Sequence, residues 1–238
     1  MITLTLVLPA HNEGQSIRET LLEIDSVDLE GVNLTIYVSE DGSLDNTRSE
    51  VQVASGITSK TKIILAPPAE RLGYSKAVLR GILNCNTELI GFMDADGQFD
   101  PNDITNLVNK IEKETIVIGF RNPRRDSRIR ILYSKAFGLA YRFFGGPKRI
   151  DPSSPFIICN TKDIKFLGEI NPHLKFGFWW EFQTRIHRTG IKIIEVPVAH
   201  RVRTSGNTQV YSLAKMPKIV ISHLVGLYRL RQELVRSK

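Results

Sequence analysis

The sequence predicts an α/β protein with a mostly parallel central sheet and helices on both of its faces. Apolar segments of strand length alternate along the chain with segments of amphipathic helical periodicity. Five strands separated by four helices imply a parallel sheet that is covered on both faces. Charged clusters directly follow most of these segments, and α/β sheets bind their ligands at that end of their strands.

The alternation is regular over the first half of the chain. Ile17, Leu21 and Ile24 form one apolar stripe of the first predicted helix, and Pro101 stands at the start of the last. The expected strands are residues 2–10, 33–39, 61–66, 88–93 and 115–120. The expected helices are residues 16–24, 44–54, 74–85 and 101–113.

The second half, from about residue 124, is less regular, and we expect it to extend the same domain. The predicted organisation is one domain over residues 1–210 and a C-terminal amphipathic helix over residues 211–238. One side of this last segment is apolar, with Val220, Leu224, Leu227 and Leu234. Basic residues lie around the other side: Arg229, Arg231, Arg236 and Lys238. Such a helix fits an anionic membrane surface, and a partner-docking helix is nearly as well supported.

The composition limits the class of protein. Of the 238 residues, 42% are hydrophobic and 24% are charged, which excludes a disordered or fibrous chain. The net charge of +7 predicts an anionic partner: nucleic acid, a membrane surface or a phosphorylated substrate. Cys85 and Cys159 are far apart, so we expect no disulfide framework and a reducing, cytosolic location. The apolar stretch 219–228 is too short to span a bilayer, and the N-terminal segment alternates like a strand rather than a signal peptide.

The segment "DADGQ" after the fourth strand is the most informative cluster. Asp94 and Asp96 are two residues apart, so in extended backbone their carboxylates face the same side. Two converging carboxylates repel each other unless a cation lies between them. A hard divalent ion, Mg²⁺ or Mn²⁺, would accept these oxygens and the amide oxygen of Gln98. A helix-capping acidic turn explains the same segment about as well.

Four motifs together resemble a known family. "LVLPAHNE", "VSEDGSLDNT", "LGYSKAVLRG" and "DADGQFDP", in this order, are similar to the family two glycosyltransferases with the GT-A fold. Within that family, the similarity is greatest to the dolichyl-phosphate mannose and polyprenyl-phosphate hexose synthases. The resemblance is strong over residues 3–120 and looser over 121–210. It implies a nucleotide-sugar-binding half, residues 1–120, and an acceptor-binding half, residues 121–210.

The resemblance also implies roles for single residues. The nucleotide-sugar site would contain Pro9, His11, Glu13, Glu40, Asp41, Gly73, Asp94 and Asp96. The metal ligands would be Asp94, Asp96 and Gln98. The family pattern has aspartate where this chain has Glu40 and tyrosine where it has His11, so the choice of nucleotide is the least constrained inference.

Basic residues of the second half would bind the acceptor phosphate. The resemblance implies this role for Arg121, Arg130 and Arg203, which with Asp96 form the predicted catalytic set. Guanidinium groups suit phosphate because they donate in a fixed fork and stay charged. The helix predicted from Ile129 is cationic and amphipathic. Its extra aromatic residues fit a membrane-facing surface, and they are Tyr133, Phe137, Tyr141 and Phe144.

These observations predict an inverting, metal-dependent glycosyltransferase. The donor would be a nucleotide sugar linked to GDP or UDP, the acceptor a polyprenyl or dolichyl phosphate, and the location the inner face of a membrane, to which the protein binds peripherally. No nucleic acid is expected, whereas a membrane-protein partner or self-association is compatible with the sequence. With a saccharide acceptor instead, Glu181 would be the candidate base. A nucleotidyltransferase, or a module that binds nucleic acid or membrane without catalysis, ranks lower.

Overall fold

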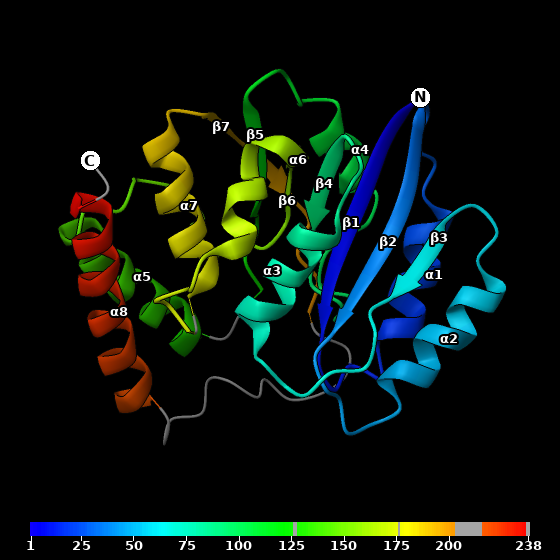
Figure 1. Cartoon of the computed structure of the whole chain (residues 1–238), viewed down its shortest axis with the longest axis horizontal. Helices are drawn as coiled ribbons and strands as arrows, with labels where there is room; N and C mark the ends of the chain where they lie inside the picture. The colour runs from blue at the N-terminus through cyan, green and yellow to red at the C-terminus, as the bar shows by residue number, and fades with distance from the viewer. Residues whose placement is uncertain (126–127, 176, 203–215, 237–238) are drawn as a thin grey trace.

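The computed structural model describes residues 1–125, 128–175, 177–202 and 216–236. The described residues form a seven-stranded sheet in the order β3-β2-β1-β4-β6-β5-β7 (Figure 1). The strands are β1 Ile2–Ala10, β2 Val32–Glu40, β3 Lys62–Leu65, β4 Leu89–Phe92, β5 Thr115–Arg121, β6 Ile157–Asn160 and β7 Lys192–Val198. Only β6 runs antiparallel to its neighbours, β4 and β5. The predicted α/β class with a mostly parallel sheet is therefore confirmed.

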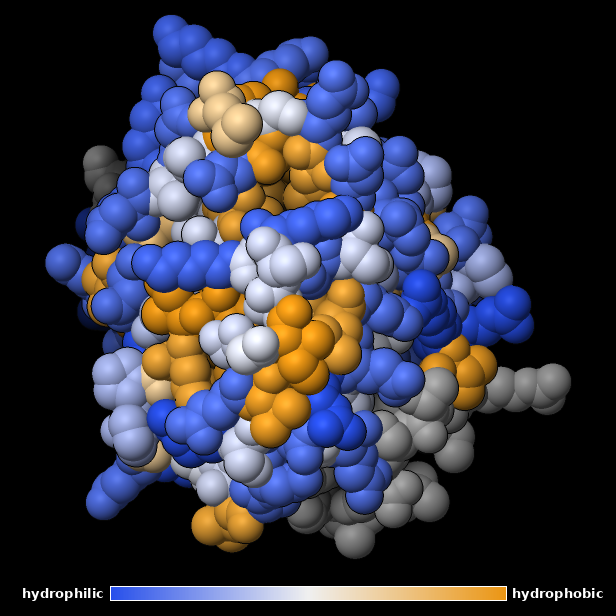
Figure 2. Space-filling model, turned by 90° about the vertical axis from the view of Figure 1, so that its right-hand side faces the viewer, coloured by the Kyte–Doolittle hydropathy of each residue, from blue (hydrophilic) through white to orange (hydrophobic). Residues whose placement is uncertain are grey.

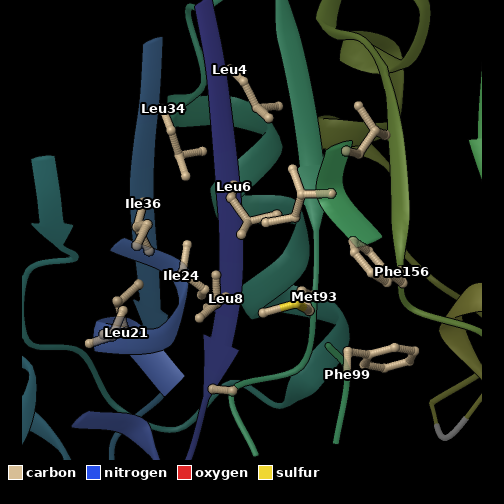
Figure 3. Close-up of a cluster of buried hydrophobic side chains, with 14 of the residues drawn as sticks. Leu4, Leu6, Leu8, Leu21, Ile24, Leu34, Ile36, Met93, Phe99 and Phe156 are labelled. Carbon is tan, nitrogen blue, oxygen red and sulfur yellow. The ribbon is translucent and has the colours of Figure 1, made fainter. Parts of the chain in front are cut away.

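Helices cover both faces of the sheet. They are α1 Ile17–Ser26, α2 Thr47–Ile57, α3 Tyr74–Asn84, α4 Asp103–Val108, α5 Arg128–Phe143, α6 Thr161–Ile164, the 3₁₀ helix η1 Lys165–Glu169, α7 Phe178–Thr189 and α8 Met216–Arg236. Apolar residues of α1, α2 and α4 pack on one face, and those of α3 and α7 on the other. In Figure 3, Leu4, Leu6 and Leu8 of β1 face the α1 side, where Leu21 and Ile24 meet them. Successive side chains of β1 point to opposite faces of the sheet and therefore contribute to two separate hydrophobic cores.

The strands and helices predicted for the first half are present, with two differences. The expected helix over residues 101–113 is limited to α4, Asp103–Val108. The last predicted strand, β5, does not pair with β4, because β6 lies between them and binds both. The chain reaches β6 only after α5, so this pairing joins segments far apart in sequence, and local periodicity does not reveal it.

Three of the four aromatic residues expected to face a membrane, Phe137, Tyr141 and Phe144, face inward instead, which corrects that expectation for them. Tyr141 is 1% exposed, and Phe137 and Phe144 pack beside it against Trp180 of α7 and Leu227 of α8. Large rings bury the most apolar area, so they occupy the interface between the three helices. The exposed large apolar residues among the described side chains of α5 are Leu132, Leu139 and Phe143.

The polar network that fixes α8 lies at its C-terminal end. Arg185 of α7 forms ion pairs with Glu181 of its own helix and with Glu233 of α8, each at 2.7 Å. His173 also contacts Glu233, at 2.6 Å. The pKa of Glu233 is lowered to about 2 by the hydrogen bond from Arg185, with burial opposing the shift and the contact with His173 adding to it.

In the described part of the chain, no helix is both long and apolar enough to cross a bilayer.

Strand β3 forms one edge of the sheet, and β7 forms the other. The residues of β3 alternate between exposed and half-buried. Figure 2 looks toward this side of the molecule and shows apolar surface broken up by polar side chains. Val53 and Ile57 of α2 and Ile64 of β3 are among the exposed apolar residues of this region. Lys62 is exposed on the same strand, and a lysine on an edge strand discourages pairing with other chains.

Two helical glycines provide a test of the packing of α3 on the sheet. A Cβ atom at Gly81 would overlap Val7 of β1, whereas one at Gly56 of α2 would meet nothing within 4 Å. We expect Gly81→Ala to lower the free energy of unfolding by about 1–3 kcal/mol through overpacking. The matched variant Gly56→Ala should raise it by about 0.5–1 kcal/mol, because alanine restricts the unfolded chain. Urea unfolding of both variants measures the difference; equal effects would contradict the packing of α3 on β1.

Candidate active site

The carboxyl ends of β1, β2 and β4 meet at one edge of the sheet, at the bottom of Figure 1. Ala10, the last residue of β1, lies opposite Glu40, the last residue of β2. The backbone N–H of Asp41 continues this pairing by donating to the carbonyl of Ala10 at 2.9 Å. The loops that carry the predicted nucleotide-sugar and metal residues therefore leave the sheet from the same edge.

Asp41 organises the loop that leads into α3. Its two carboxylate oxygens accept the backbone N–H groups of Leu72 and Gly73, each at 2.8 Å. Gly73 has a φ of 96°, a left-handed conformation that favours glycine, and α3 begins at the next residue. Asp41 is 5% exposed. The contacts described for this carboxylate are thus with the backbone, and its contact with the nucleotide stays a prediction, as does that of Gly73.

Glu40 is directed into the loop that it begins. Its carboxylate accepts the N–H of Ser43 and a hydrogen bond from Arg48 of α2 at 2.9 Å. Its backbone carbonyl accepts a hydrogen bond from Arg80 of α3. Burial opposes ionisation, but the hydrogen bonds from Ser43 and Arg48 outweigh it and lower the pKa of Glu40. The extra methylene relative to aspartate lets this side chain reach α2, and a role in nucleotide binding stays a prediction.

The loop after β1 is held against the loop after β2. Nδ1 of His11 lies 2.8 Å from the carbonyl oxygen of Asp41, and because a carbonyl only accepts, Nδ1 carries the proton. The N–H of Glu13 donates to Thr47 at 2.9 Å, and Ser16 donates to the Glu13 carboxylate at 3.2 Å. Pro9 is buried in β1. The structure therefore brings these predicted residues to one place; their nucleotide contacts stay predictions.

Asp94 and Asp96 follow β4 in different surroundings. Asp94 is half-buried and accepts a hydrogen bond from the Tyr74 hydroxyl at 2.8 Å. Asp96 is 8% exposed and accepts the N–H of Gln98 at 3.2 Å. The Gln98 side-chain amide donates to the carbonyl of Arg201 at 3.3 Å, so its oxygen is the atom that could meet a cation.

These three side chains form an oxygen donor set that suits Mg²⁺ or Mn²⁺. Magnesium is commonly bound by one or two carboxylates, with substrate phosphates and water completing its octahedron. Among the residues that the structure describes, no three His, Cys, Asp or Glu side chains are grouped as metal ligands. The role of Asp94, Asp96 and Gln98 as metal ligands stays a prediction.

A second charged cluster lies at the end of β5. Nε and Nη2 of Arg121 donate to the two oxygens of Asp151 at 2.7 and 2.9 Å, and Nη2 also donates to Ser153 at 2.6 Å. Arg124 lies 3.9 Å from the same carboxylate. Burial would raise the pKa of Asp151, but the hydrogen bonds and charge of Arg121, with the charge of Arg124, lower it to about 2. The structure thus gives Arg121 a structural partner, and its binding of phosphate stays a prediction.

An apolar cavity of about 200 Å³ adjoins this cluster, between α5, α7 and α8. Its polar lining includes Arg124, Ser134 and Ser153, and Arg124 donates to Ser134 at 3.1 Å. The other lining residues are mostly apolar: Tyr133, Ala136, Phe137, Ala140, Trp180, Ile219, Val220, His223 and Leu224. The cavity thus joins a guanidinium group to an apolar wall, which suits a molecule with an anionic head and an apolar tail.

Three further predicted residues have different outcomes. Arg130 belongs to α5, but its side chain is not among those described, and Arg203 lies outside the described residues. Glu181 is 0% exposed, and its carboxylate accepts the N–H groups of His173 and Leu174 and two bonds from Arg185. It is a buried structural acid, which corrects its assignment as the candidate base.

The motifs did not reveal two residues next to Asp94. The Trp179 indole N–H donates to the Tyr74 hydroxyl at 2.9 Å, and Tyr74 in turn contacts Asp94. Both tryptophans of α7 are buried, at 5% and 6% exposure. The available signal for Tyr74 was its position after the Leu-Gly of "LGYSKAVLRG". Ser153 and Arg124 carried a weaker signal, as polar residues near predicted strand ends.

Known proteins resemble this chain over most of its length. Residues 5–166 match the family described as glycosyl transferase family 2. A dolichol-phosphate mannosyltransferase of Pyrococcus furiosus is 28% identical over 234 residues, covering 95% of this chain and 63% of that protein. An uncharacterized glycosyltransferase of Mycobacterium tuberculosis is 25% identical, covering 87% and 88%. An undecaprenyl-phosphate 4-deoxy-4-formamido-L-arabinose transferase of Shewanella sediminis is 29% identical, covering 55% and 40%. The chain thus spans less than two thirds of two of these relatives.

Solved structures share the fold. Glucosyl-3-phosphoglycerate synthase from Mycobacterium tuberculosis, in complex with Mn²⁺, UDP and glucosyl-3-phosphoglycerate, superposes with a TM-score of 0.69 at 18% identity. That match covers 95% of this chain and 80% of the other. The complex of the same enzyme with Mn²⁺, UDP-glucose and phosphoglyceric acid gives a TM-score of 0.68. At this identity the likeness concerns the fold, and it confirms the predicted GT-A architecture.

The pairing of Asp151 with Arg121 predicts a pH dependence of stability. The native pKa of about 2 lies below the ordinary value of an aspartate, so the stabilisation is complete above that ordinary value and is lost as the pH falls through 2. Between about pH 5 and about pH 2, we expect the free energy of unfolding to fall by about 2 kcal/mol more in the wild type than in Asp151→Asn. Asp28→Asn, at an exposed aspartate, is the control and should follow the wild type. Parallel curves for the wild type and Asp151→Asn would contradict the pairing.

Proposed function

The chain belongs to glycosyl transferase family 2, and from this membership we propose that it transfers a hexose from a GDP- or UDP-linked nucleotide sugar to a polyprenyl or dolichyl phosphate. Two of the relatives support this acceptor class, because the name of one includes dolichol phosphate and that of the other undecaprenyl phosphate. The chain spans only part of those relatives. The acceptor is therefore argued from this chain's own residues.

The observation that carries the proposal is the apolar cavity with Arg124 and Ser153 in its lining. A polyprenyl phosphate has an anionic head on an apolar chain, so its binding site needs a cation beside an apolar wall. Guanidinium groups form strong, fixed hydrogen bonds with phosphate oxygens. Arg121 and Arg124 share Asp151, and of the two it is Arg124 that lines the cavity. Arg124 is thus the best-supported phosphate ligand among the described side chains; Arg121, Arg130 and Arg203 stay further candidates.

The acceptor phosphate would act as the nucleophile. One of its oxygens attacks the anomeric carbon, the bond from that carbon to the nucleoside diphosphate breaks, and the sugar configuration inverts. A phosphate monoester already carries most of its second negative charge at neutral pH, so no general base is required. This agrees with the burial of Glu181. A saccharide hydroxyl would need a base to remove its proton.

Asp94, Asp96 and Gln98 would hold Mg²⁺ or Mn²⁺ at the donor side. When bound there, the ion stabilises the charge that develops on the departing diphosphate. The Mn²⁺ in the similar solved enzyme supports a divalent ion here. Residues at the ends of β1 and β2 and in the loops after β1, β2 and β3 would bind the nucleoside: Pro9, His11, Glu13, Glu40, Asp41 and Gly73.

Peripheral binding to a membrane follows from the acceptor. The apolar stripe of α5 and the outer face of α8 expose apolar residues beside basic ones, a pattern typical of interfacial helices. The apolar residues are Leu132, Leu139, Phe143, Ile221, Val225 and Tyr228. Arg142, Arg229 and Arg231 are exposed on the same helices. α5, α7 and α8 lie together at the left of Figure 1, so this surface and the cavity belong to one end of the molecule. The cytoplasmic side of the membrane stays a prediction.

Transfer assays with variants at the donor side and at the acceptor side test the proposal. We expect hexose transfer from GDP- or UDP-sugars to a short polyprenyl phosphate, abolished in Asp96→Asn. Arg124→Ala should raise the KM for the polyprenyl phosphate about tenfold and leave that for the nucleotide sugar nearly unchanged, because one charge-assisted hydrogen bond is lost. Arg188→Ala removes an equal charge from an exposed site on α7 and should change neither KM. Transfer only to saccharide hydroxyls would overturn the proposed acceptor.

Vesicle binding tests the membrane surface separately. Phe143→Glu places a charge on the exposed stripe of α5 and should reduce co-sedimentation with anionic phospholipid vesicles several-fold. Ile57→Glu makes the same kind of change on α2, at the far side of the sheet, and should bind as the wild type does. Equal loss in both variants, or loss in neither, would contradict the assignment of this surface.

A further inference from the structure

We propose that Tyr74 is a positioning residue. Its hydroxyl fixes the carboxylate of Asp94 at the donor side and connects it to Trp179 in the first turn of α7. The next residue, Trp180, forms a wall of the apolar cavity. This inference rests on the proposed function, because it concerns how the two substrate sites are connected. The four motifs give Tyr74 no role, whereas its hydroxyl contacts both Asp94 and Trp179.

A directed hydrogen-bond chain joins Trp179, Tyr74 and Asp94. The Trp179 indole N–H can only donate, and it lies 2.9 Å from the Tyr74 hydroxyl oxygen. The hydroxyl has a single proton, which it donates to Oδ1 of Asp94 at 2.8 Å. Since a carboxylate only accepts, the direction of the chain is fixed from α7 to Asp94. One oxygen of Asp94 is thereby oriented by the protein.

The two donor residues of this hydrogen-bond series, Tyr74 and Trp179, are held by rigid parts of the fold. Tyr74 is the first residue of α3, and the N–H of the preceding Gly73 is bound by Asp41. Trp179 is 5% exposed and packs edge-on against Phe92 of β4, with ring centroids 5.3 Å apart. The position of the Tyr74 hydroxyl is therefore set by the nucleotide loop on one side and by α7 on the other.

The adjacent tryptophan faces the acceptor side. Trp180 packs edge-on against Phe137 and Tyr141 of α5, at centroid distances of 4.7 and 4.8 Å, and it lines the apolar cavity. Two consecutive residues of α7 thus reach the two proposed substrate sites. A shift of the first turn of α7 would move both indoles, so the donor carboxylate and the acceptor wall cannot change independently.

Binding measurements test the role of Tyr74. The probe is Mn²⁺ titrated by calorimetry in the presence of UDP and, separately, of GDP, with the full chain. We expect Tyr74→Phe to weaken Mn²⁺ binding about 10- to 100-fold, the range typical for loss of a group that orients a metal ligand. Trp179→Phe keeps the Tyr74 contact with Asp94 and should give a smaller loss. Ser55→Ala removes a hydroxyl from an exposed position on α2 and should bind as the wild type does.

Fluorescence gives a readout that a purely structural role would not change. The chain contains two tryptophans, so Trp180→Phe leaves Trp179 as the single emitter. In this background we expect Mg²⁺ with the matching nucleoside diphosphate to shift the Trp179 emission, because the ligand acts on Asp94 and hence on the hydroxyl that accepts the indole N–H. The shift should disappear when Tyr74→Phe is added.

The outcomes separate this inference from the proposed function. Absence of any Mn²⁺ binding by the wild type with either diphosphate would overturn both. Wild-type binding that is unchanged in Tyr74→Phe would overturn the inference alone, and so would a fluorescence shift that survives Tyr74→Phe. Thermal unfolding of each variant shows whether it is folded at the temperature of the titration. If Tyr74→Phe is unfolded, Tyr74→His, which keeps a ring and a donor, replaces it and should retain more binding than Tyr74→Leu; equal binding by those two would overturn the inference.

Discussion

The carboxylate of Asp41 makes the contact on which the active-site edge depends. It accepts the backbone N–H groups of Leu72 and Gly73, the two residues just before α3. This contact sets where α3 begins and therefore where Tyr74 stands. Asp94 is oriented from Tyr74, and α7 is joined to the same point through Trp179. Loops from three separate strands are thus connected through short polar contacts rather than through apolar packing.

Much of the fold follows from local periodicity. The strands of the first half have the expected positions because each combines an apolar run with a turn or helix on either side. The place of β6 between β4 and β5 was not predictable in this way, since it depends on pairing between segments separated by a long helix. Nor did the sequence show which side of α5 faces inward. Both sides carry apolar residues, and the larger rings of Phe137 and Tyr141 occupy the buried one.

The motifs singled out candidate residues but not the partners of their side chains. Asp94, Asp96 and Gln98 follow β4 within one short loop, yet Asp94 contacts Tyr74 and the side-chain amide of Gln98 contacts the carbonyl of Arg201. Glu40 and Arg121 engage partners that lie in other elements, Arg48 in one case and Asp151 in the other. A sequence pattern records which residue types are present, whereas these contacts depend on how distant segments meet. The same limit applied to Glu181: its partner Arg185 is four residues along the same helix, but the contact of Arg185 with Glu233 of α8 depends on how α7 and α8 pack.

The antiparallel strand β6 has a consequence for the spacing of charge. β4 and β5 run in the same direction with β6 between them, so the ends that carry Asp94 and Arg121 lie two strand spacings apart, about 10 Å. Direct pairing of β4 with β5 would halve that interval and set carboxylate against guanidinium. The reversed strand thus acts as a spacer that keeps Asp94 from pairing with Arg121, whose guanidinium pairs with Asp151 instead.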